Sequence, residues 1–304
     1  MTLLVLGEEE VRQLLSVDEC IEAMADVLAR LAHGELQQPL RSITRAADGA
    51  SMLGLMPAHR SGDRSTWSLK EIVVVPDNPT RGLDPHQGAV LLHDGATGQL
   101  RAVLNASPIT EIRTAAVSAV ATRALARPGA GVVAILGGGV QARSHAAAMR
   151  AVLPDAEIRT WTRAGGDSPE STLRGADVVC TCTSAREPIV RREWLAPGAH
   201  VNAVGSSQPS ARELDAETVA AATLVVDRRE SALNEAGDLL LAGFGEERIA
   251  AELGDVLTGA HPGRSSEDEL TVFKSLGLAV EDLAAAELVV RRAREQGIGI
   301  EVAF

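Results

Sequence analysis

A glycine-rich turn, Gly137-x-Gly139-x-x-Ala142, follows directly after the apolar run Val132–Leu136. In this motif the first glycine makes a tight turn and the second lets a pyrophosphate approach the backbone, while the N-terminus of the following helix favours its charge. The required context is a buried strand before the turn and a helix after it. The run before the turn and the helical pattern over residues 140–153 supply that context, so we predict a dinucleotide site rather than a mere tight connection.

The residues at the end of the next predicted strand indicate which dinucleotide binds. A site for NAD usually places Asp or Glu there, about 20 residues after the turn, whereas this chain has Thr162 and Arg163. The planar guanidinium of Arg163 suits a 2′-phosphate, and the hydroxyl of Thr162 adds a donor. The sequence therefore favours NADPH over NADH. The alternative is that Arg163 is only a solvated loop charge, since a strand end is uncertain by a residue or two.

Lys70 interrupts the apolar run 69–75. Lysine is rarely buried in a strand unless it lines a cavity or has a partner. In a cavity, its ammonium group could bind an anion or relay a proton. The alternative is a lysine on an edge strand whose stem is buried while the ammonium group reaches water.

Other kinds of catalytic site have little support in the sequence. The seven histidines form no His-x-His or His-x-x-x-His pair, so no metal site is predicted, and there is no Gly-x-Ser-x-Gly elbow for a nucleophilic serine. Three cysteines cannot make a disulfide framework, which fits a reducing compartment. A net charge of −12 without a basic cluster argues against binding to nucleic acid or to an anionic membrane.

The 304 residues, 45% of them hydrophobic, are enough for two domains. No apolar run approaches the length of a membrane span, and the first residues turn acidic at once, so neither a span nor a signal peptide is expected. We expect a cytoplasmic protein.

The pattern along the chain predicts an α/β fold with two parts. Residues 8–33 have helical spacing with a capping box at Ser16 and Glu19, and residues 51–104 resemble an antiparallel sheet with strands at 69–75, 89–92 and 100–104. A helix is expected from Thr110 to Leu125. Beyond it, strands alternate with helical or loop segments, as in a doubly wound parallel sheet. These strands are predicted at 132–136, 158–162, 178–183, 201–204 and 224–226, with a last helix over 276–294.

Several segments together resemble the ornithine cyclodeaminase/mu-crystallin family, and most of all its mu-crystallin, or ketimine reductase, branch. They cover nearly the whole chain, in the family's order and spacing. The segments are 76–79, 86–88, 112–116, 137–142, 200–205, 212–215, 226–227, 232–238 and 271–277.

This resemblance implies a Rossmann domain inserted into a second, α+β domain that binds substrate and forms a homodimer. We expect residues 1–112 and 277–304 to form the substrate-binding and dimerisation domain, and residues 113–276 the NADP-binding domain. The family acts on α-imino or α-amino acids with a nicotinamide cofactor. The small anionic substrate would be such an acid.

The resemblance also implies site residues. Arg41, Lys70 and Arg113 would gather around the substrate carboxylate and act in catalysis, with Ser207 as a further substrate-binding position. Because Arg113 lies beside Thr114 at the start of the expected helix, an anion at Arg113 would also meet the helix dipole. Solvated charges are the alternative for both arginines. The expected cofactor-binding positions are His86, Arg113, Thr114, Gly137, Gly139, Val140, Gln141, Ala142, Thr162, Arg163, Thr183, Val204, Ser206 and Ser275. An ordinary turn histidine is the alternative for His86.

Two departures from the family pattern bear on the direction of the reaction. Ser207 stands where cyclodeaminases and alanine dehydrogenases have an acid/base aspartate, and Gly54 or Leu55 stands near the position of the cyclodeaminase glutamate. Oxidative deamination must activate water with a general base, whereas reduction of a ketimine needs only a hydride and a proton. We therefore expect reduction of a cyclic α-imino acid such as pyrroline- or piperideine-2-carboxylate, or a sulfur-containing analogue. The alternatives are a cyclodeaminase or alanine dehydrogenase activity, and a non-catalytic NADPH- or ligand-binding protein.

A third departure concerns the predicted Rossmann domain. Only residues 164–174 separate Arg163 from Gly175, which is roughly 15 residues fewer than the family segment, judged by the usual length of a βαβ unit. We expect a shortened Rossmann domain with a more open adenosine side.

Overall fold

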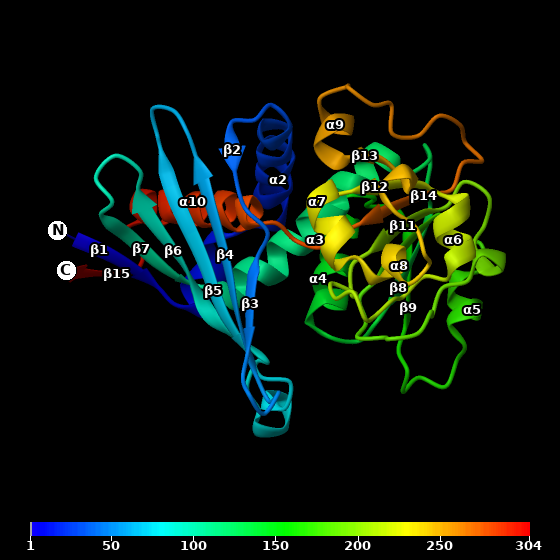
Figure 1. Cartoon of the computed structure of the whole chain (residues 1–304), viewed down its shortest axis with the longest axis horizontal. Coiled ribbons are helices and arrows are strands. Elements are labelled where there is room, and N and C mark those ends of the chain that lie inside the picture. The colour runs from blue at the N-terminus through cyan, green and yellow to red at the C-terminus, as the bar shows by residue number, and fades with distance from the viewer. Residues whose placement is uncertain (1) are drawn as a thin grey trace. The chain divides into compact units, whose positions relative to one another are not determined.

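The computed structural model describes residues 2–304 and divides them into two compact units (Figure 1). The first unit combines the chain up to Arg113 with Leu278–Phe304, and the second comprises Thr114–Gly277. The second unit is thus inserted into the first, and each boundary lies one residue later than the sequence suggested.

The first unit is built on one mixed sheet. Its strands are β1 (Thr2–Leu6), β2 (Leu36–Gln37), β3 (Ser42–Arg45), β4 (Met52–Arg60), β5 (Thr66–Val74), β6 (His86–Asp94), β7 (Leu100–Asn105) and β15 (Ile300–Ala303). Their order is β15-β1-β7-β6-β5-β4-β2, with β3 beside β4. Neighbours are antiparallel except β1 and β7, which are parallel.

Helices cover one face of this sheet. They are α1 (Glu8–Leu14), α2 (Val17–Ala32) and α10 (Ala279–Gln296), and a 3-10 turn occupies Asn78–Arg81. Helix α10 packs on β4, β5 and β6 and against α2 (Figure 1). The predicted cap of α2 is present, because the hydroxyl of Ser16 accepts the backbone N–H of Glu19. The C-terminal part of the chain therefore supplies the helix that covers strands made by its N-terminal part.

Two expectations for this unit were incomplete or wrong. Strands β1 and β15 were not anticipated, because each is a short segment that becomes a strand only by pairing with partners far away in the sequence. Helix α3 (Ala106–Leu125) begins before Thr110. Its start is set by Asn105, whose side-chain oxygen accepts the N–H of Ser107 at 3.0 Å. An Asn followed by Pro108 in the first turn is a helix-start signal.

The second unit is a Rossmann-like domain with one parallel sheet. Its strands are β8 (Val132–Leu136), β9 (Glu157–Trp161), β10 (Val178–Thr181), β11 (His200–Ala203), β12 (Thr223–Val226), β13 (Ile249–Glu252) and β14 (Thr271–Lys274). They are ordered β13-β12-β14-β11-β10-β8-β9. Its helices, besides the rest of α3, are α4 (Val140–Val152), α5 (Pro169–Leu173), α6 (Ala216–Ala221), α7 (Arg229–Glu235), α8 (Gly237–Leu240) and α9 (Leu253–Leu257), with 3-10 turns at Arg192–Trp194 and Glu246–Arg248.

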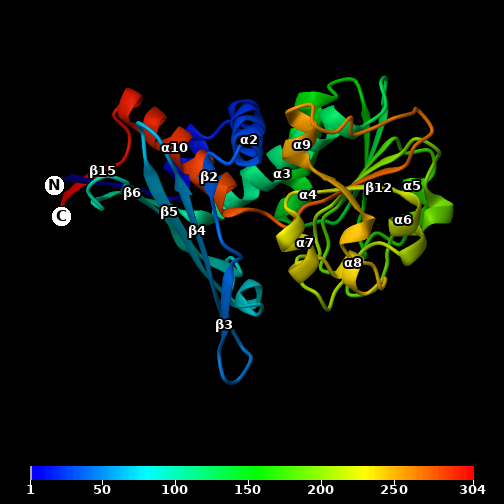
Figure 2. The same cartoon turned by 45° about the horizontal axis from the view of Figure 1, so that its top comes forward.

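Helices lie on both sides of this parallel sheet (Figure 2). The predicted strands are present with ends within two residues of those expected, while β13 and β14 were not predicted as strands. The short connection after β9 holds only α5, and β9 is the edge of the sheet. The chain reverses its direction of strand addition around β8, which makes the carboxyl ends of β8 and β10 the switch point where such sheets bind ligands.

Candidate active site

The glycine turn lies at this switch point, directly after β8. Gly137 has a φ of 138°, and its N–H donates to the carbonyl of Trp161 at 2.8 Å. A Cβ at Gly137 would stand 2.4 Å from the carbonyl oxygen of Cys182, which follows β10. Only glycine fits here, because both the backbone angle and the approach of the neighbouring strand end exclude a side chain.

Helix α4 starts from this turn with an end that suits an anion. Gly139 is the N-cap residue, and within residues 2–304 no side chain caps the helix and no acidic residue stands in its first turn. A Cβ at Gly139 would meet open space, with no described atom within 4 Å. Unpaired N–H groups and the helix dipole favour a phosphate at such an end, so the turn fits the pyrophosphate of a dinucleotide.

The end of β9 lies beside the turn. Thr162 begins a tight turn closed by the N–H of Gly165 on its carbonyl at 3.0 Å, and Arg163 is exposed within it. The methyl group of Thr162 would be 3.0 Å from a Cβ placed on Gly138. Arg143 of α4 reaches the glycine turn, where its side chain donates to the carbonyl of Gly138 at 3.4 Å. Sequence analysis missed Arg143, although it lies one residue past Ala142 of the motif.

Four other expected cofactor positions follow strand ends in the second unit, and all four are hydrogen-bonded within the protein. Thr183 donates its N–H at 2.9 Å and its hydroxyl at 2.7 Å to Glu213. Ser206 donates its hydroxyl to the carbonyl of Ala211, and Ser275 donates its N–H to Ala203 at 3.0 Å. The fourth position, Val204, donates its backbone N–H to the carbonyl of Thr181 at 3.2 Å. Glu213 organises this region, yet sequence analysis gave it no role beyond lying in a family segment.

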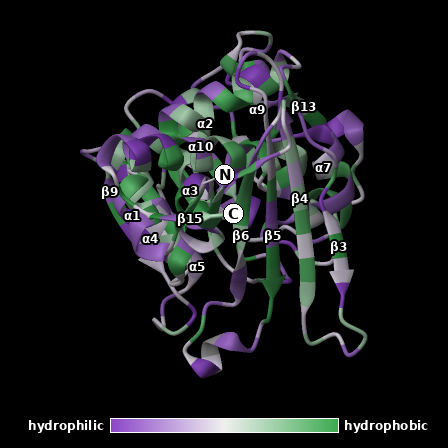
Figure 3. Cartoon of the chain, turned by 90° about the vertical axis from the view of Figure 1, so that its left-hand side faces the viewer, coloured by the Kyte–Doolittle hydropathy of each residue, from purple (hydrophilic) through white to green (hydrophobic). Residues whose placement is uncertain are grey.

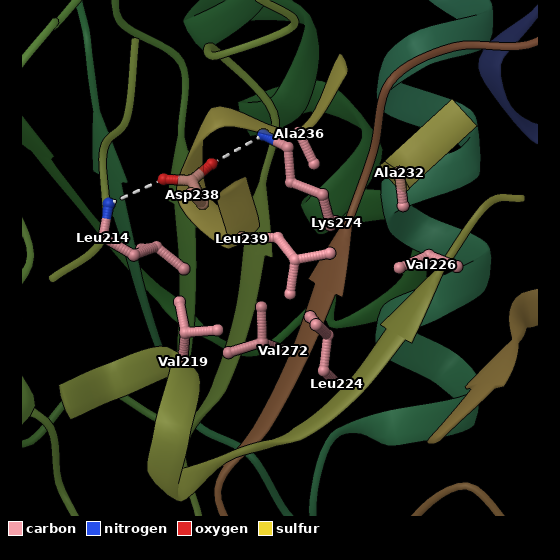
Figure 4. Close-up of a pocket in the computed structure, with 10 residues that line it drawn as sticks. All are labelled: Leu214, Val219, Leu224, Val226, Ala232, Ala236, Asp238, Leu239, Val272 and Lys274. Atoms are coloured by element: carbon pink, nitrogen blue, oxygen red, sulfur yellow. Dashed lines mark hydrogen bonds and ion pairs between the residues drawn. The ribbon is translucent and has the colours of Figure 1, made fainter. Parts of the chain in front are cut away.

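Below these strand ends lies a buried ion pair (Figure 4). Lys274 Nζ is 2.9 Å from Asp238 Oδ2, and Asp238 Oδ1 accepts the backbone N–H groups of Glu213 and Leu214. The two charged side chains line a small pocket of about 10 Å³ whose other walls are apolar. Burial raises the pKa of Glu213, and the charge of Lys274 opposes that rise. The pair thus anchors the segment that carries Glu213.

In the first unit, Lys70 lies on β5 with its side chain on the face covered by α10. Its cross-strand partners Met56 and Val90 are buried, and Lys70 itself is only 2% exposed. Its Nζ is 2.8 Å from Oδ2 of Asp282 and 3.5 Å from the hydroxyl of Thr110. Lys70 is therefore a buried, paired ammonium group and not an edge-strand lysine that reaches water.

Arg113 joins the same buried group from α3. Its Nη1 is 2.8 Å from Glu281, and its Nε is 3.1 Å from Asp282. The expectation that Arg113 stands at a helix start was wrong, because α3 begins at Ala106 and Arg113 lies in its interior. Neighbouring Thr114 is also buried. Two carboxylates of α10, rather than the dipole of its own helix, dominate the surroundings of Arg113.

The two carboxylates come from the first turn of α10. Glu281 and Asp282 are 0% and 1% exposed. The side-chain oxygen of Gln38 accepts the N–H of Val280 at 3.0 Å and so caps this helix end. Carboxylates are favoured in a first helical turn. Sequence analysis missed both residues, although two adjacent acids in a helix of mostly apolar residues are an available signal.

Arg41 and His86 are electrostatically coupled to Lys70. Burial lowers the pKa of Lys70 to about 8; Asp282 opposes this, whereas Arg113 and Arg41 add to it. Burial also lowers the pKa of His86, with Asp84 opposing and Lys70 contributing. Arg113 thus shares a carboxylate with Lys70, and Arg41 and His86 lie within electrostatic reach of Lys70, although the side chain of His86 is 52% exposed.

Ser207 is the one expected substrate-binding position that lies in the second unit. It is exposed in the second unit, in the loop after β11. Within residues 2–304, no cluster of three or more His, Cys, Asp or Glu side chains could hold a metal ion, and no helix is long and apolar enough to cross a membrane.

Comparison with known proteins assigns the chain to a family. The model of the ornithine cyclodeaminase/mu-crystallin family matches residues 1–167 and 163–297. The ketimine reductase mu-crystallin of Mus musculus is 42% identical, over 93% of this chain and 95% of that protein. The structure of Thermococcus litoralis Delta(1)-pyrroline-2-carboxylate reductase in complex with NADH and L-proline is similar with a TM-score of 0.90 and 33% identity, covering 98% of this chain and 100% of that one.

An archaeal alanine dehydrogenase dimer with bound NAD is similar with a TM-score of 0.94 and 31% identity, over the full length of both chains. The family model, the curated relative and both solved structures therefore agree, and together they cover both units. The chain belongs to the ornithine cyclodeaminase/mu-crystallin family.

Proposed function

We propose that this chain is an oxidoreductase that reduces the C=N bond of an α-imino carboxylic acid, with NADPH as the preferred cofactor, and yields the corresponding amino acid. The observation that carries the proposal is the buried Lys70, which is grouped with two arginines and has a pKa lowered to about 8. An ammonium group with a pKa near neutrality can both attract an anionic substrate and give up a proton. The reductase names of the relatives support the same reaction.

In this proposal each cation of the first unit has a role. Arg41 and Arg113 bind the substrate carboxylate and orient the neighbouring C=N carbon. Lys70 binds at the same carboxylate or gives its proton to the imine nitrogen. His86 lies close enough to respond to the charge of Lys70, and it would contact cofactor or substrate. Ser207 is proposed as a further substrate contact.

The second unit would hold the cofactor. Gly137, Gly139 and the first turn of α4, from Val140 to Ala142, would receive the pyrophosphate, and Thr162 with Arg163 would hold a 2′-phosphate. Thr114, Thr183, Val204, Ser206 and Ser275 are proposed as further positions along the dinucleotide. When bound, the nicotinamide supplies a hydride, that is, two electrons and one hydrogen, to the imine carbon. The protein supplies the remaining proton, so the products are the amino acid and the oxidised cofactor.

The proposed direction of the reaction follows from the acid and base groups that the chain contains. Reduction needs one proton donor, which Lys70 can provide, whereas deamination must also activate water. Ser207 stands where relatives with that chemistry have an aspartate. We therefore favour cyclic ketimines such as pyrroline- or piperideine-2-carboxylate as substrates.

A screen of cyclic and linear α-imino acids, with NADPH oxidation followed by absorbance, tests this function. We expect turnover with at least one cyclic ketimine. Rapid oxidation of ornithine or alanine with NAD(P)⁺, together with no reduction of piperideine-2-carboxylate, would instead favour a dehydrogenase or cyclodeaminase activity. Absence of NADPH binding in a fluorescence titration would contradict every enzymatic assignment.

Arg163→Ala is expected to weaken NADPH binding about tenfold or more while changing NADH binding little, because a charge-assisted hydrogen bond to a 2′-phosphate contributes about 1.5–3 kcal/mol. Dissociation constants from fluorescence titration give the comparison. Arg159→Ala is the matched control, since Arg159 lies on β9 but pairs with Glu157 at 2.9 Å. Equal losses for both cofactors in Arg163→Ala would refute the 2′-phosphate assignment.

We also propose a homodimer formed through the face of the first sheet opposite α10. Pairing places Val5, Leu69, Leu91 and Val103 in one row on that face, and each is only partly buried, while Trp67 is 48% exposed. Figure 3 shows apolar residues along β4, β5 and β6, the strands in front. A row of apolar side chains is what a second copy would cover. The alanine dehydrogenase relative, whose structure is a dimer, supports this.

Leu91→Glu is expected to convert the dimer into a monomer, because it places a charge at the middle of the apolar row. Analytical ultracentrifugation measures the change as a halved mass. The control is Leu241→Glu, an apolar residue of the second unit that is 48% exposed, and it should leave the mass unchanged. A wild-type protein that sediments as a monomer at micromolar concentration would contradict the dimer.

We further propose that the protein works in the cytoplasm. Its three cysteines are free, and Cys20 and Cys180 are buried. Free thiols fit a reducing compartment.

A further inference from the structure

The chain contains only two lysines, Lys70 and Lys274, against 27 arginines. Each lysine is 2% exposed and pairs with a buried aspartate, Lys70 with Asp282 at 2.8 Å and Lys274 with Asp238 at 2.9 Å. Arginine stays charged at any physiological pH, whereas a desolvated lysine can lose its proton. At position 70 the chain therefore uses the basic side chain whose charge depends on its partner.

Asp282 has a special place among the buried charges around Lys70. Its two carboxylate oxygens contact different cations. Oδ2 is 2.8 Å from Nζ of Lys70, and Oδ1 is 3.1 Å from Nε of Arg113. Glu281, the other carboxylate of this turn, contacts Arg113 at 2.8 Å. Lys70 and Arg113 balance Glu281 and Asp282, so the four charges sum to zero. Without Asp282, Lys70 would lose the carboxylate that touches it, and the three remaining groups would carry a net charge of +1.

The charged and titratable groups that influence Lys70 come from every element packed around it. Burial is the largest influence and favours the neutral amine, and the positive charges of Arg113 and Arg41 act in the same direction. Asp282 is the group that opposes them. The remaining neighbours are Glu281 on α10, which pairs with Arg113; His86 on β6, which responds to Lys70; and Cys20 on α2, which responds to Arg113 and Glu281.

We propose that Asp282 is a positioning residue that keeps Lys70 protonated and holds its ammonium group in place for the reaction. The use of that ammonium group in imine reduction rests on the proposed function, whereas the pairing itself does not. Asp282 acts only through Lys70 and Arg113. It is the carboxylate that lets a fully buried lysine carry a proton at neutral pH.

The small number of lysines makes a direct test possible. In protein grown with isotope-labelled lysine, NMR should show two side-chain signals, and Lys274→Arg assigns them by removing one. We expect the Lys70 signal of the wild type to titrate near pH 8 and that of Asp282→Asn to titrate at least one pH unit lower. Glu287→Gln is the matched control, because Glu287 lies on the same helix but pairs with Arg60 at 2.6 Å. Its Lys70 titration should match the wild type.

The pH dependence of kcat/KM provides the second measurement. Loss of activity at high pH should begin at least one unit lower in Asp282→Asn, so that kcat/KM at pH 8 falls about fivefold or more. Asp282→Glu, which keeps the charge, should restore most of the wild-type profile. Asp282→Ser is a second uncharged variant, should Asp282→Asn fail to fold.

The outcomes separate this proposal from the proposed function. If the Lys70 titration moves but no imine is reduced, the pairing stands and the function fails. A Lys70 titration that is the same in folded Asp282→Asn or Asp282→Ser as in the wild type overturns the proposal, whatever the activity.

Discussion

Lys70→Met is expected to lower kcat/KM for reduction of an α-imino acid about a thousandfold at pH 7, within the range by which positioned proton donors accelerate reactions. The ammonium group is fully buried beside Asp282, so no water or second lysine can replace it at that place. Steady-state kinetics with a cyclic ketimine and NADPH measures the loss. NADPH binding should remain, because the glycine turn belongs to the second unit.

Two further variants separate the charge of Lys70 from its proton. Lys70→Arg keeps the positive charge but cannot release a proton near neutral pH, so it should keep much of the substrate affinity while kcat stays low. Lys70→Met alone removes the partner of Asp282 Oδ2 and leaves Asp282 paired only with Arg113, and breaking one partner of a typical buried pair costs about 3–5 kcal/mol. The double variant Lys70→Met with Asp282→Asn should regain stability without regaining activity. Full activity in Lys70→Arg would show that only the charge matters.

The free energy of unfolding is expected to fall steeply as the pH drops from 6.5 to 5, because two buried histidines in the second unit resist protonation. Burial lowers the pKa of His145 to about 4 and that of His200 to about 3. His145 is held by the hydroxyl of Ser118 at 2.9 Å and the carbonyl of Gln141 at 2.7 Å. His200 is held by Thr271 and Asn202.

The sign follows from where protons bind. Above pH 6.5 these histidines are neutral in both the folded and the unfolded chain and contribute no pH dependence. Below pH 6.5 the unfolded chain binds protons that the folded chain excludes, so stability decreases until the pH reaches the folded pKa values. Each histidine should cost about 2 kcal/mol between pH 6.5 and 5, at about 1.4 kcal/mol per pH unit. Glu213 and Glu287, whose pKa values are raised by burial, act in the opposite direction.

Urea denaturation of the wild type, His145→Gln and His200→Gln at pH 7 and pH 5 isolates each contribution. Each variant should be less stable than the wild type at pH 7 but should lose about 2 kcal/mol less on acidification. Because the difference is taken between variant and wild type, the carboxylates cancel. Equal losses in all three proteins would mean that neither histidine is held neutral in the folded state.

Local patterns in the sequence predicted local structure well. Strand β8, the glycine turn and α4 follow from contiguous residues, since a buried strand reads as an apolar run and Gly137 marks a positive φ. The short connection after β9, which holds only α5, could be predicted from the number of residues between the two strands. Strands β1, β14 and β15 could not, because each is short and becomes a strand only by pairing with a segment far away in the sequence.

In the candidate site, too, the sequence predicted some residues and only the tertiary structure showed the others. Lys70 could be singled out because a lysine in an apolar run needs an explanation. Its explanation, Asp282, lies 212 positions further along the chain, on a helix that packs over β5. The resemblance suggested that Arg113 belongs with Lys70, but it did not indicate that Glu281 and Asp282 neutralise both.

The sequence by itself determined the family, the dinucleotide-binding turn and the residue types that can bind an anion, because these depend on short segments with fixed backbone requirements. The tertiary structure decided which charges meet. Burial and charge pairing are set by contacts between distant segments, and these contacts set the pKa of Lys70. Whether Lys70 is a proton donor or an inert amine thus depends on where α10 places one carboxylate.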